Sequence, residues 1–241
     1  MAYEFEYMNR VDDLLHEVAE KNSDQIHELA ERIADTIRND KMIHTFGTGH
    51  SHMIGIELFA RAGGLGNVDA MLDPDVLTSN GAQRSGAMEK LSGVSDIIYD
   101  KYNIQPGDIM IISSNSGRNA MPIEMAMRAK KEGVYVVAVT SLATSMAQPS
   151  RHSSGKHLYE LADMVIDNCV PAGDSLVEYG GIKTGPGSTM ASIFVLDTAA
   201  VEAIRMLTEE GVKPPVFQSQ NVDGFDNDAI YDHYEGRVLH F

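Results

Sequence analysis

The pattern of hydrophobic residues changes near residue 39. Before this point, apolar side chains recur every three or four positions, and this spacing predicts two helices within residues 5–38. Five short runs rich in β-branched or large apolar residues follow, at 42–46, 68–72, 108–114, 134–141 and 162–168. Stretches with helical spacing lie between them, at about 51–62, 84–102 and 120–132. Strands that alternate with helices predict an α/β fold with a parallel sheet covered on both faces.

The C-terminal part of the sequence contains a long helix followed by a polar tail. Helical spacing runs from Ser188 to Glu210, and Gly211 and Pro214 end it. Residues 216–241 show no helical period, and we expect only packing on the domain to order them. The predicted organisation is a helical arm (1–39), one α/β domain (40–212) and a C-terminal tail packed on the domain (213–241).

The arm and the 188–210 helix carry more apolar surface than one sheet should need. An apolar stripe that the chain's own sheet does not cover is typical of a contact between subunits. We therefore expect a homodimer or a homotetramer. Packing within one chain is the alternative explanation for the arm.

Composition restricts the partners. The 241 residues include 19 basic and 35 acidic side chains, and the net charge of −16 repels nucleic acid and anionic membranes. No apolar stretch reaches the roughly 18 residues of a membrane span. The single cysteine, Cys169, excludes an internal disulfide and favours a reducing compartment, so we expect a cytoplasmic protein. An anionic ligand would need a pocket with many local donors.

The stretch "HTFGTGHSHM" (His44–Met53) follows the first predicted strand and opens a helix, which is where parallel sheets bind ligands. A dinucleotide site would need G-x-G-x-x-G, and Gly47 and Gly49 fit, but His52 holds the third position. A P-loop would need Gly-Lys-Ser/Thr, which is missing. We therefore expect no nucleotide cofactor.

Histidines in the same stretch raise the question of a metal. A metal site needs three or four convergent ligands. The candidates are scattered along the chain: His44, His50, His52, Glu57, His152 and His157. The alternative is that these histidines donate hydrogen bonds in a polar pocket, and we expect no metal.

A second loop, "ISSNSGRN", also runs from a strand into a helix and is crowded with hydroxyl and amide groups. Hydroxyls and the free backbone amides of a helix N-terminus can bind a phosphate without positive charge. An ordinary N-cap would account for one such residue and not for five. Two further turns, at 140–145 and 188–189, carry hydroxyls after a strand or before a helix. The pattern favours a phosphorylated ligand.

Together, "FGTGHS…ELFARAGGL" and "ISSNSGRN" resemble the sugar isomerase (SIS) domain family, in particular its phosphoheptose isomerase-like branch. Ser114, Ser116 and Gly117 match the second motif, and Asn119 stands where a hydroxyl residue is usual. "TGPGST" is similar to a turn of the muramic acid phosphate etherases, but the glutamate of that turn is missing, which argues against an etherase.

The resemblance implies a five-stranded, flavodoxin-like parallel sheet that binds a phosphorylated sugar at the strand ends. The family motifs match at Gly47, Gly49, Ser51, Ser114, Ser116 and Gly117, and the polar residues around them add further expected phosphate and sugar contacts at His50, Asn115, Asn119, Thr140 and Ser141. Family members include isomerases, etherases and sugar-phosphate sensors. The resemblance therefore implies the ligand class better than the reaction.

An aldose–ketose isomerase needs a base beside the carbon and a donor for the oxygens. Ser51, Ile54 and Glu57 stand three residues apart, so we expect them to share a helix face toward the pocket and assign the base to Glu57. Glu89 is the second candidate base. His52 is the expected proton donor, with His157 as its alternative, and Arg151 and Lys156 offer cations that could close over the phosphate. The rival function is a phosphosugar sensor without catalysis.

Overall fold

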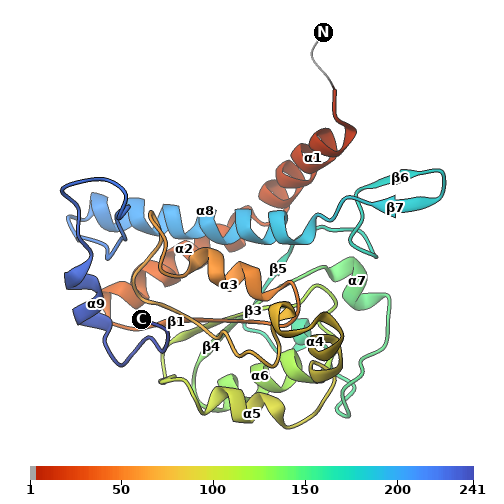
Figure 1. Ribbon diagram of the computed structural model, residues 1–241, viewed down its shortest axis with the longest axis horizontal. Coiled ribbons are helices and arrows are strands. Elements are labelled where there is room, and N and C mark those ends of the chain that lie inside the picture. Colours follow the sequence, from red (N-terminus) through yellow and green to blue (C-terminus); the bar gives the residue numbers. More distant parts are fainter. Residues whose placement is uncertain (1–3) are drawn as a thin grey trace.

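The computed structural model describes residues 4–241 and is built around a parallel sheet of five strands (Figure 1). The strands are β1 (Ile43–Gly47), β2 (Val68–Ala70), β3 (Ile109–Ser113), β4 (Tyr135–Thr140) and β5 (Met164–Asp167). They lie in the order β2-β1-β3-β4-β5, and each neighbouring pair is parallel. The predicted α/β fold is confirmed, and each strand overlaps the apolar run that predicted it.

Helices cover both faces of the sheet because successive strand residues point to opposite sides. Ile109 and Ile111 of β3 join a core with the helices on one face, whereas Met110 and Ile112 join a core on the other. The first face is covered by α2 (Ser23–Arg38), α3 (His52–Leu58) and α8 (Ser188–Glu209), and the second by α5 (Val94–Tyr99) and α6 (Ala120–Lys131) (Figure 1). Within residues 4–241, none of the helices combines the length and hydrophobicity that a membrane crossing requires.

Three segments differ from the sequence prediction. The helix expected over 84–102 is two helices, α4 (Ala82–Met88) and α5, because Gly93 before α5 has a φ of +84°. The tail contains a helix, α9 (Asp228–Tyr234). An antiparallel hairpin of β6 (Val177–Tyr179) and β7 (Ile182–Thr184) precedes α8. The remaining short elements are η1 (Thr78–Asn80), α7 (Leu142–Met146) and η2 (Leu158–Glu160).

The two helices of the arm differ in how much they bury. α2 packs along α8 and contributes Leu29 and Ile33, among others, to the core. α1 (Glu6–Lys21) buries only Leu14 and Val18 within the described residues, and Figure 1 shows it extending away from the body of the molecule. Met8 of α1 is 65% exposed. The arm thus keeps an uncovered apolar side, and the dimer or tetramer stays a prediction.

A buried histidine on β1 connects the sheet to the tail. The Nδ1 atom of His44 lies 3.5 Å from Asp69 Oδ2, and its Nε2 atom lies 3.2 Å from Asp108 Oδ2. Burial opposes protonation of His44, but the two carboxylates outweigh it and raise the histidine pKa above its ordinary value. The backbone N–H of Leu239 donates to Asp69 Oδ1 over 3.1 Å. The end of the tail is therefore fastened to β2, an edge strand of the sheet.

Candidate functional site

A polar cleft lies at the carboxyl ends of β1 and β3. The chain leaves β1 for β2 on one side and later returns to β3 on the other, and this reversal is where open α/β sheets bind ligands. Gly47, which ends β1, is the register partner of Ser113, which ends β3. The cleft is lined by His50, Ser51, Ile54, Ser113, Ser114, Asn115, Val139, Asn168, Ser188, Thr189 and Ser192. These residues come from the ends of four strands and from the first turns of α3 and α8.

Two glycines allow the loops to approach the strand ends. A Cβ atom on Gly47 would lie 2.5 Å from the carbonyl oxygen of Ser51, because the turn into α3 folds back on the strand. Gly117 has a φ of +56°, and a Cβ there would lie 3.1 Å from Ser145 Oγ and 3.2 Å from Leu158 Cβ. Both motifs that resemble the SIS family therefore need glycine, Gly47 because of a close backbone approach and Gly117 also because of its left-handed backbone conformation.

The structure sorts most of the predicted phosphate and sugar contacts into three groups. Those that line the cleft are His50, Ser51, Ser114 and Asn115. Gly47, at the end of β1, and Gly49, Ser116 and Gly117, in the two loops, lie beside the cleft without lining it. The hydroxyls of Thr140 and Ser141 serve the fold instead. Thr140 Oγ1 donates to the carbonyl of Asn115 over 3.3 Å. Ser141 Oγ donates to the carbonyl of Val170 over 2.7 Å and, as the N-cap of α7, accepts the backbone N–H of Thr144.

Two lining residues, Asn168 and Ser192, were not singled out in the sequence. Asn168 Nδ2 donates to Asn115 Oδ1 over 3.0 Å and to Ser192 Oγ over 3.3 Å. Asn168 directly follows β5, so its position after a strand could have pointed to it. Ser192 lies one helical turn after the hydroxyl turn at 188–189, and only the packing of α8 shows that it faces the cleft.

The N-terminus of α8 borders the cleft but is already capped. Asp174 Oδ1 accepts the backbone N–H groups of Gly187 and Ser188 at 3.0 and 2.8 Å, and its Oδ2 accepts the Ser188 hydroxyl at 2.7 Å. A carboxylate at a helix N-terminus is favourable because of the helix dipole. The hydroxyls that α8 still offers to a ligand are therefore those of Thr189 and Ser192.

Glu89 is joined to both loops of the cleft. Its Oε2 accepts the Thr48 hydroxyl at 2.8 Å, and its Oε1 accepts the side-chain N–H of Asn119 at 2.7 Å. Thr48 lies in the turn after β1, and Asn119 ends the loop after β3. The Oδ1 atom of Asn119 in turn accepts a guanidinium N–H of Arg151 at 3.0 Å. Asn119 therefore contacts an acid and a cation of the chain itself, where the resemblance implied a ligand contact.

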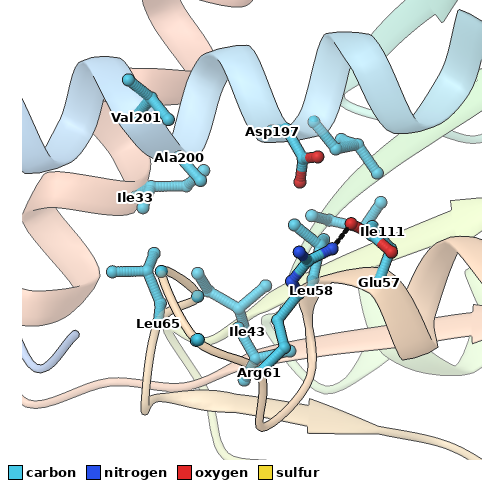
Figure 2. A pocket seen from close by; sticks show the side chains of 15 residues that line it. Ile33, Ile43, Glu57, Leu58, Arg61, Leu65, Ile111, Asp197, Ala200 and Val201 are labelled. Atoms are coloured by element: carbon cyan, nitrogen blue, oxygen red, sulfur yellow. Dashed lines mark ion pairs between the residues drawn. The ribbon is translucent and has the colours of Figure 1, made fainter. Parts of the chain in front are cut away.

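Glu57 lies in a different place from the cleft. It lines an apolar cavity of about 200 Å³ between α2, α3 and α8, where it forms an ion pair with Arg61 (Figure 2). Each step of three residues rotates a helix by about 60°, so Glu57 is turned by about 120° from Ser51. Ser51 and Ile54 line the cleft, and Glu57 does not share their face. Asp197 of α8 borders the same cavity, and burial raises the pKa of its carboxyl despite the nearby Arg61.

The candidate histidines do not converge. His50 is exposed and lines the cleft, whereas His52 is buried with its Nδ1 hydrogen-bonded to the carbonyl of Gly49. His157 Nε2 is hydrogen-bonded to the carbonyl of Gln148 at 2.9 Å. Within residues 4–241, no group of three or more His, Cys, Asp or Glu side chains is placed to hold a metal ion. What converges at the strand ends is a set of uncharged donors, and Glu89 is bonded to both loops without lining the cleft itself.

Comparison with known proteins identifies the family. A model of the SIS domain matches residues 6–141, and the chain belongs to the SIS domain family. It is 36% identical over 236 residues to a UPF0309 protein of Halalkalibacterium halodurans. The aligned region covers 96% of this chain and 94% of the relative. It is 41% identical over 210 residues to a UPF0309 protein of Caldanaerobacter subterraneus subsp. tengcongensis, and this aligned region covers 85% of each chain.

Solved structures share the fold at low sequence identity. A phosphoheptose isomerase from Francisella tularensis has a TM-score of 0.55 at 13% identity, covering 83% of this chain and 95% of that one. The phosphoheptose isomerase GmhA from Neisseria gonorrhoeae has a TM-score of 0.53 at 15% identity, covering 81% and 94%. The predicted SIS-type architecture is therefore confirmed.

Proposed function

We propose that this protein is a phosphosugar isomerase that interconverts an aldose phosphate and a ketose phosphate. The observation that carries the proposal is the cleft of uncharged donors with the Glu89 carboxylate bonded to both of its loops. Hydroxyl and amide donors at strand ends suit a phosphate in a chain with a net charge of −16. The fold that the chain shares with two phosphoheptose isomerases supports the reaction class.

The phosphate would be held by Ser51, Ser114 and Ser116, with Asn115 as a further donor. Ser51 and Ser114 come from different loops, so a phosphate between them would bridge β1 and β3. Ser116 is half-buried in the second loop, next to Gly117. The proposed reaction then requires the sugar carbons to lie toward Thr48 and Glu89, which are bonded to each other but do not line the cleft.

We assign the base to Glu89 and not to Glu57. Isomerisation moves a proton between C1 and C2, so the base must be a carboxylate fixed in direction but not neutralised by a cation. Glu89 accepts hydrogen bonds from two neutral groups and has no ion pair among the described residues, whereas Glu57 is paired with Arg61. His50, exposed at the rim of the cleft, is the donor that we assign to the sugar oxygens in place of the buried His52.

The experiment has two stages. A thermal-shift screen of pentose, hexose and heptose phosphates, each with its unphosphorylated sugar, identifies the ligand. Proton NMR in D₂O then follows deuterium exchange at C2 of the best binder. We expect Glu89→Gln to lower turnover by about 10²–10⁴-fold, the usual contribution of a general base, while binding is kept. Glu202→Gln, on the exposed side of α8, is the matched control.

Each outcome bears on a different part of the proposal. Loss of turnover in Glu57→Gln, with Glu89→Gln active, would return the base to the residue that helical spacing suggested. Absence of exchange with every phosphosugar that raises Tm would favour the non-catalytic sensor. Equal binding of phosphorylated and unphosphorylated sugars would refute the phosphate site itself.

A further inference from the structure

We propose that Arg151, acting through Asn119, is a positioning residue that fixes the direction of the Glu89 carboxylate. The inference rests on the proposed function in one respect, since it takes Glu89 as the base. The geometry points to a chain of three side chains, in which a guanidinium holds an amide and the amide holds the carboxylate. The two hydrogen bonds measure 3.0 Å (Arg151 Nη1 to Asn119 Oδ1) and 2.7 Å (Asn119 Nδ2 to Glu89 Oε1).

The amide in the middle has a direction that matters. An asparagine side chain presents an acceptor on one side and a donor on the other. Asn119 is only 5% exposed, so water cannot readily replace either partner. With the guanidinium of Arg151 on the oxygen side, the NH₂ group must face Glu89. Without Arg151, the amide could rotate and turn its oxygen toward the carboxylate, which would repel it.

The choice of partner by Arg151 is unusual for this chain. Eight arginines lie within 4 Å of a carboxylate: Arg10, Arg32, Arg38, Arg61, Arg84, Arg128, Arg205 and Arg237. Within the described part of the chain, Arg118 and Arg151 have no such partner, although the protein has 35 acidic residues. A surface arginine in so acidic a chain finds a carboxylate easily. One that bonds a buried amide instead is placed there by the local fold.

The backbone around Arg151 supports that placement. The N–H of Arg151 donates to the carbonyl of Arg118 at 2.8 Å, directly before Asn119. The N–H of Leu158, at the other end of the same loop, donates to the carbonyl of Gly117 at 2.8 Å. The segment from 151 to 158 is therefore tied at both ends to the loop after β3. This backbone bond holds Arg151 at a fixed distance from Asn119.

The effect of Arg151 on the position of Glu89 can be measured separately from its effect on the stability of the fold. Arg151 is exposed, and a hydrogen bond or ion pair at an exposed side chain contributes little to folding. Removing its guanidinium should leave the fold intact and act on Glu89 alone. Misplacing a catalytic group by about 1 Å can cost 10²-fold in rate, so a small rotation of the carboxylate is enough to be measured.

The kinetic test uses Arg151→Met, Arg151→Lys and Asn119→Ala, with Arg205→Met as the matched control on the far part of α8. With the phosphosugar found in the screen, we expect Arg151→Met and Asn119→Ala to lower kcat by about 10- to 100-fold with KM within threefold of the wild type. Arg151→Lys, which keeps a donor, should recover part of the loss, and Arg205→Met should behave as the wild type. A raised KM with unchanged kcat in Arg151→Met would overturn the proposal and make Arg151 a direct ligand contact.

A second measurement does not depend on turnover. The side-chain NH₂ of Asn119 gives a pair of proton–nitrogen NMR signals, assigned by their loss in Asn119→Ala. In Arg151→Met these signals should shift and exchange faster with water, while Arg205→Met leaves them unchanged. Unchanged signals in Arg151→Met would refute the positioning role. If the signals respond but no phosphosugar is turned over, the chain of side chains stands and the isomerase proposal fails.

Discussion

Two glycines in the turn between β1 and α3 are required for different reasons, and substituting each by alanine tests the two reasons separately. Gly47 has no positive φ, but a Cβ there would lie 2.5 Å from the carbonyl oxygen and 2.6 Å from the carbonyl carbon of Ser51. Gly49 has a φ of +60°, and nothing lies within 4 Å of a Cβ built on it. Gly47→Ala therefore tests a close approach of two backbones, and Gly49→Ala tests the left-handed conformation alone.

The magnitudes follow from these contacts. For Gly49→Ala, the left-handed conformation destabilises the folded state by about 1–2 kcal/mol. The lower conformational entropy of the unfolded chain offsets about 0.4–1 kcal/mol of this loss. The net loss should be at most about 1.5 kcal/mol. For Gly47→Ala, the contact of 2.5 Å must open to at least 3.0 Å, so the backbone of the turn has to move by about 0.5 Å. We expect a loss of about 2–4 kcal/mol, in the range of an overpacked and strained site.

Urea unfolding followed by circular dichroism measures both variants, and equal m-values would show that the compared states are the same. Because the Gly47 turn carries Ser51, Gly47→Ala should also lose the phosphosugar-induced rise in Tm, whereas Gly49→Ala should keep a part of it. A Gly47→Ala variant as stable as Gly49→Ala would refute the steric argument. It would mean that the turn can relax without disturbing the strand end.

Two further predictions concern charged groups outside the proposed chemistry. The raised pKa of His44 means that its ion pairs stabilise the fold fully below the unfolded value of about 6.5 and that this contribution is lost as pH rises through the folded value. The stability difference between the wild type and His44→Gln, measured by urea unfolding from pH 6 to 9, should therefore shrink with pH, and a growing difference would contradict the assignment. Asp174→Ala removes the cap of α8 and should cost about 0.5–2 kcal/mol, while Asp174→Asn should recover most of it. An Asp174→Ala variant as stable as the wild type would show that the cap contributes nothing.

The sequence predicted the sheet well because its strands are short apolar runs separated by helical spacing. It missed the hairpin at 177–184, whose two strands are only three residues long and mostly exposed, although apolar Val177, Tyr179 and Ile182 alternate with polar residues around two glycines. It joined α4 and α5 because a single glycine, Gly93, does not distinguish a break from a tolerated helix residue. Such features depend on backbone angles that composition does not record.

The candidate site was predictable to the level of its loops. Hydroxyl residues after β1 and β3 line the cleft, but the hydroxyls of Thr140 and Ser141 donate hydrogen bonds to backbone carbonyls. Nothing in one sequence separates a hydroxyl that faces a ligand from one that closes a turn. For a related reason, spacing did not show that Glu57 lies outside the cleft or that Glu89 is bonded to both loops. A helix as short as α3 rotates a residue out of the cleft within two turns, and the bonds to Glu89 come from segments 41 and 30 residues away.

The bond between Leu239 and Asp69 also has a consequence for the order of folding. It joins residues 170 positions apart. Closing so long a loop is entropically costly and delays the contact, so the tail should dock after the five strands have paired. The tail is then a late and separately reversible unit, and the Leu239 amide should exchange with deuterium faster than the amides of β3 under native conditions.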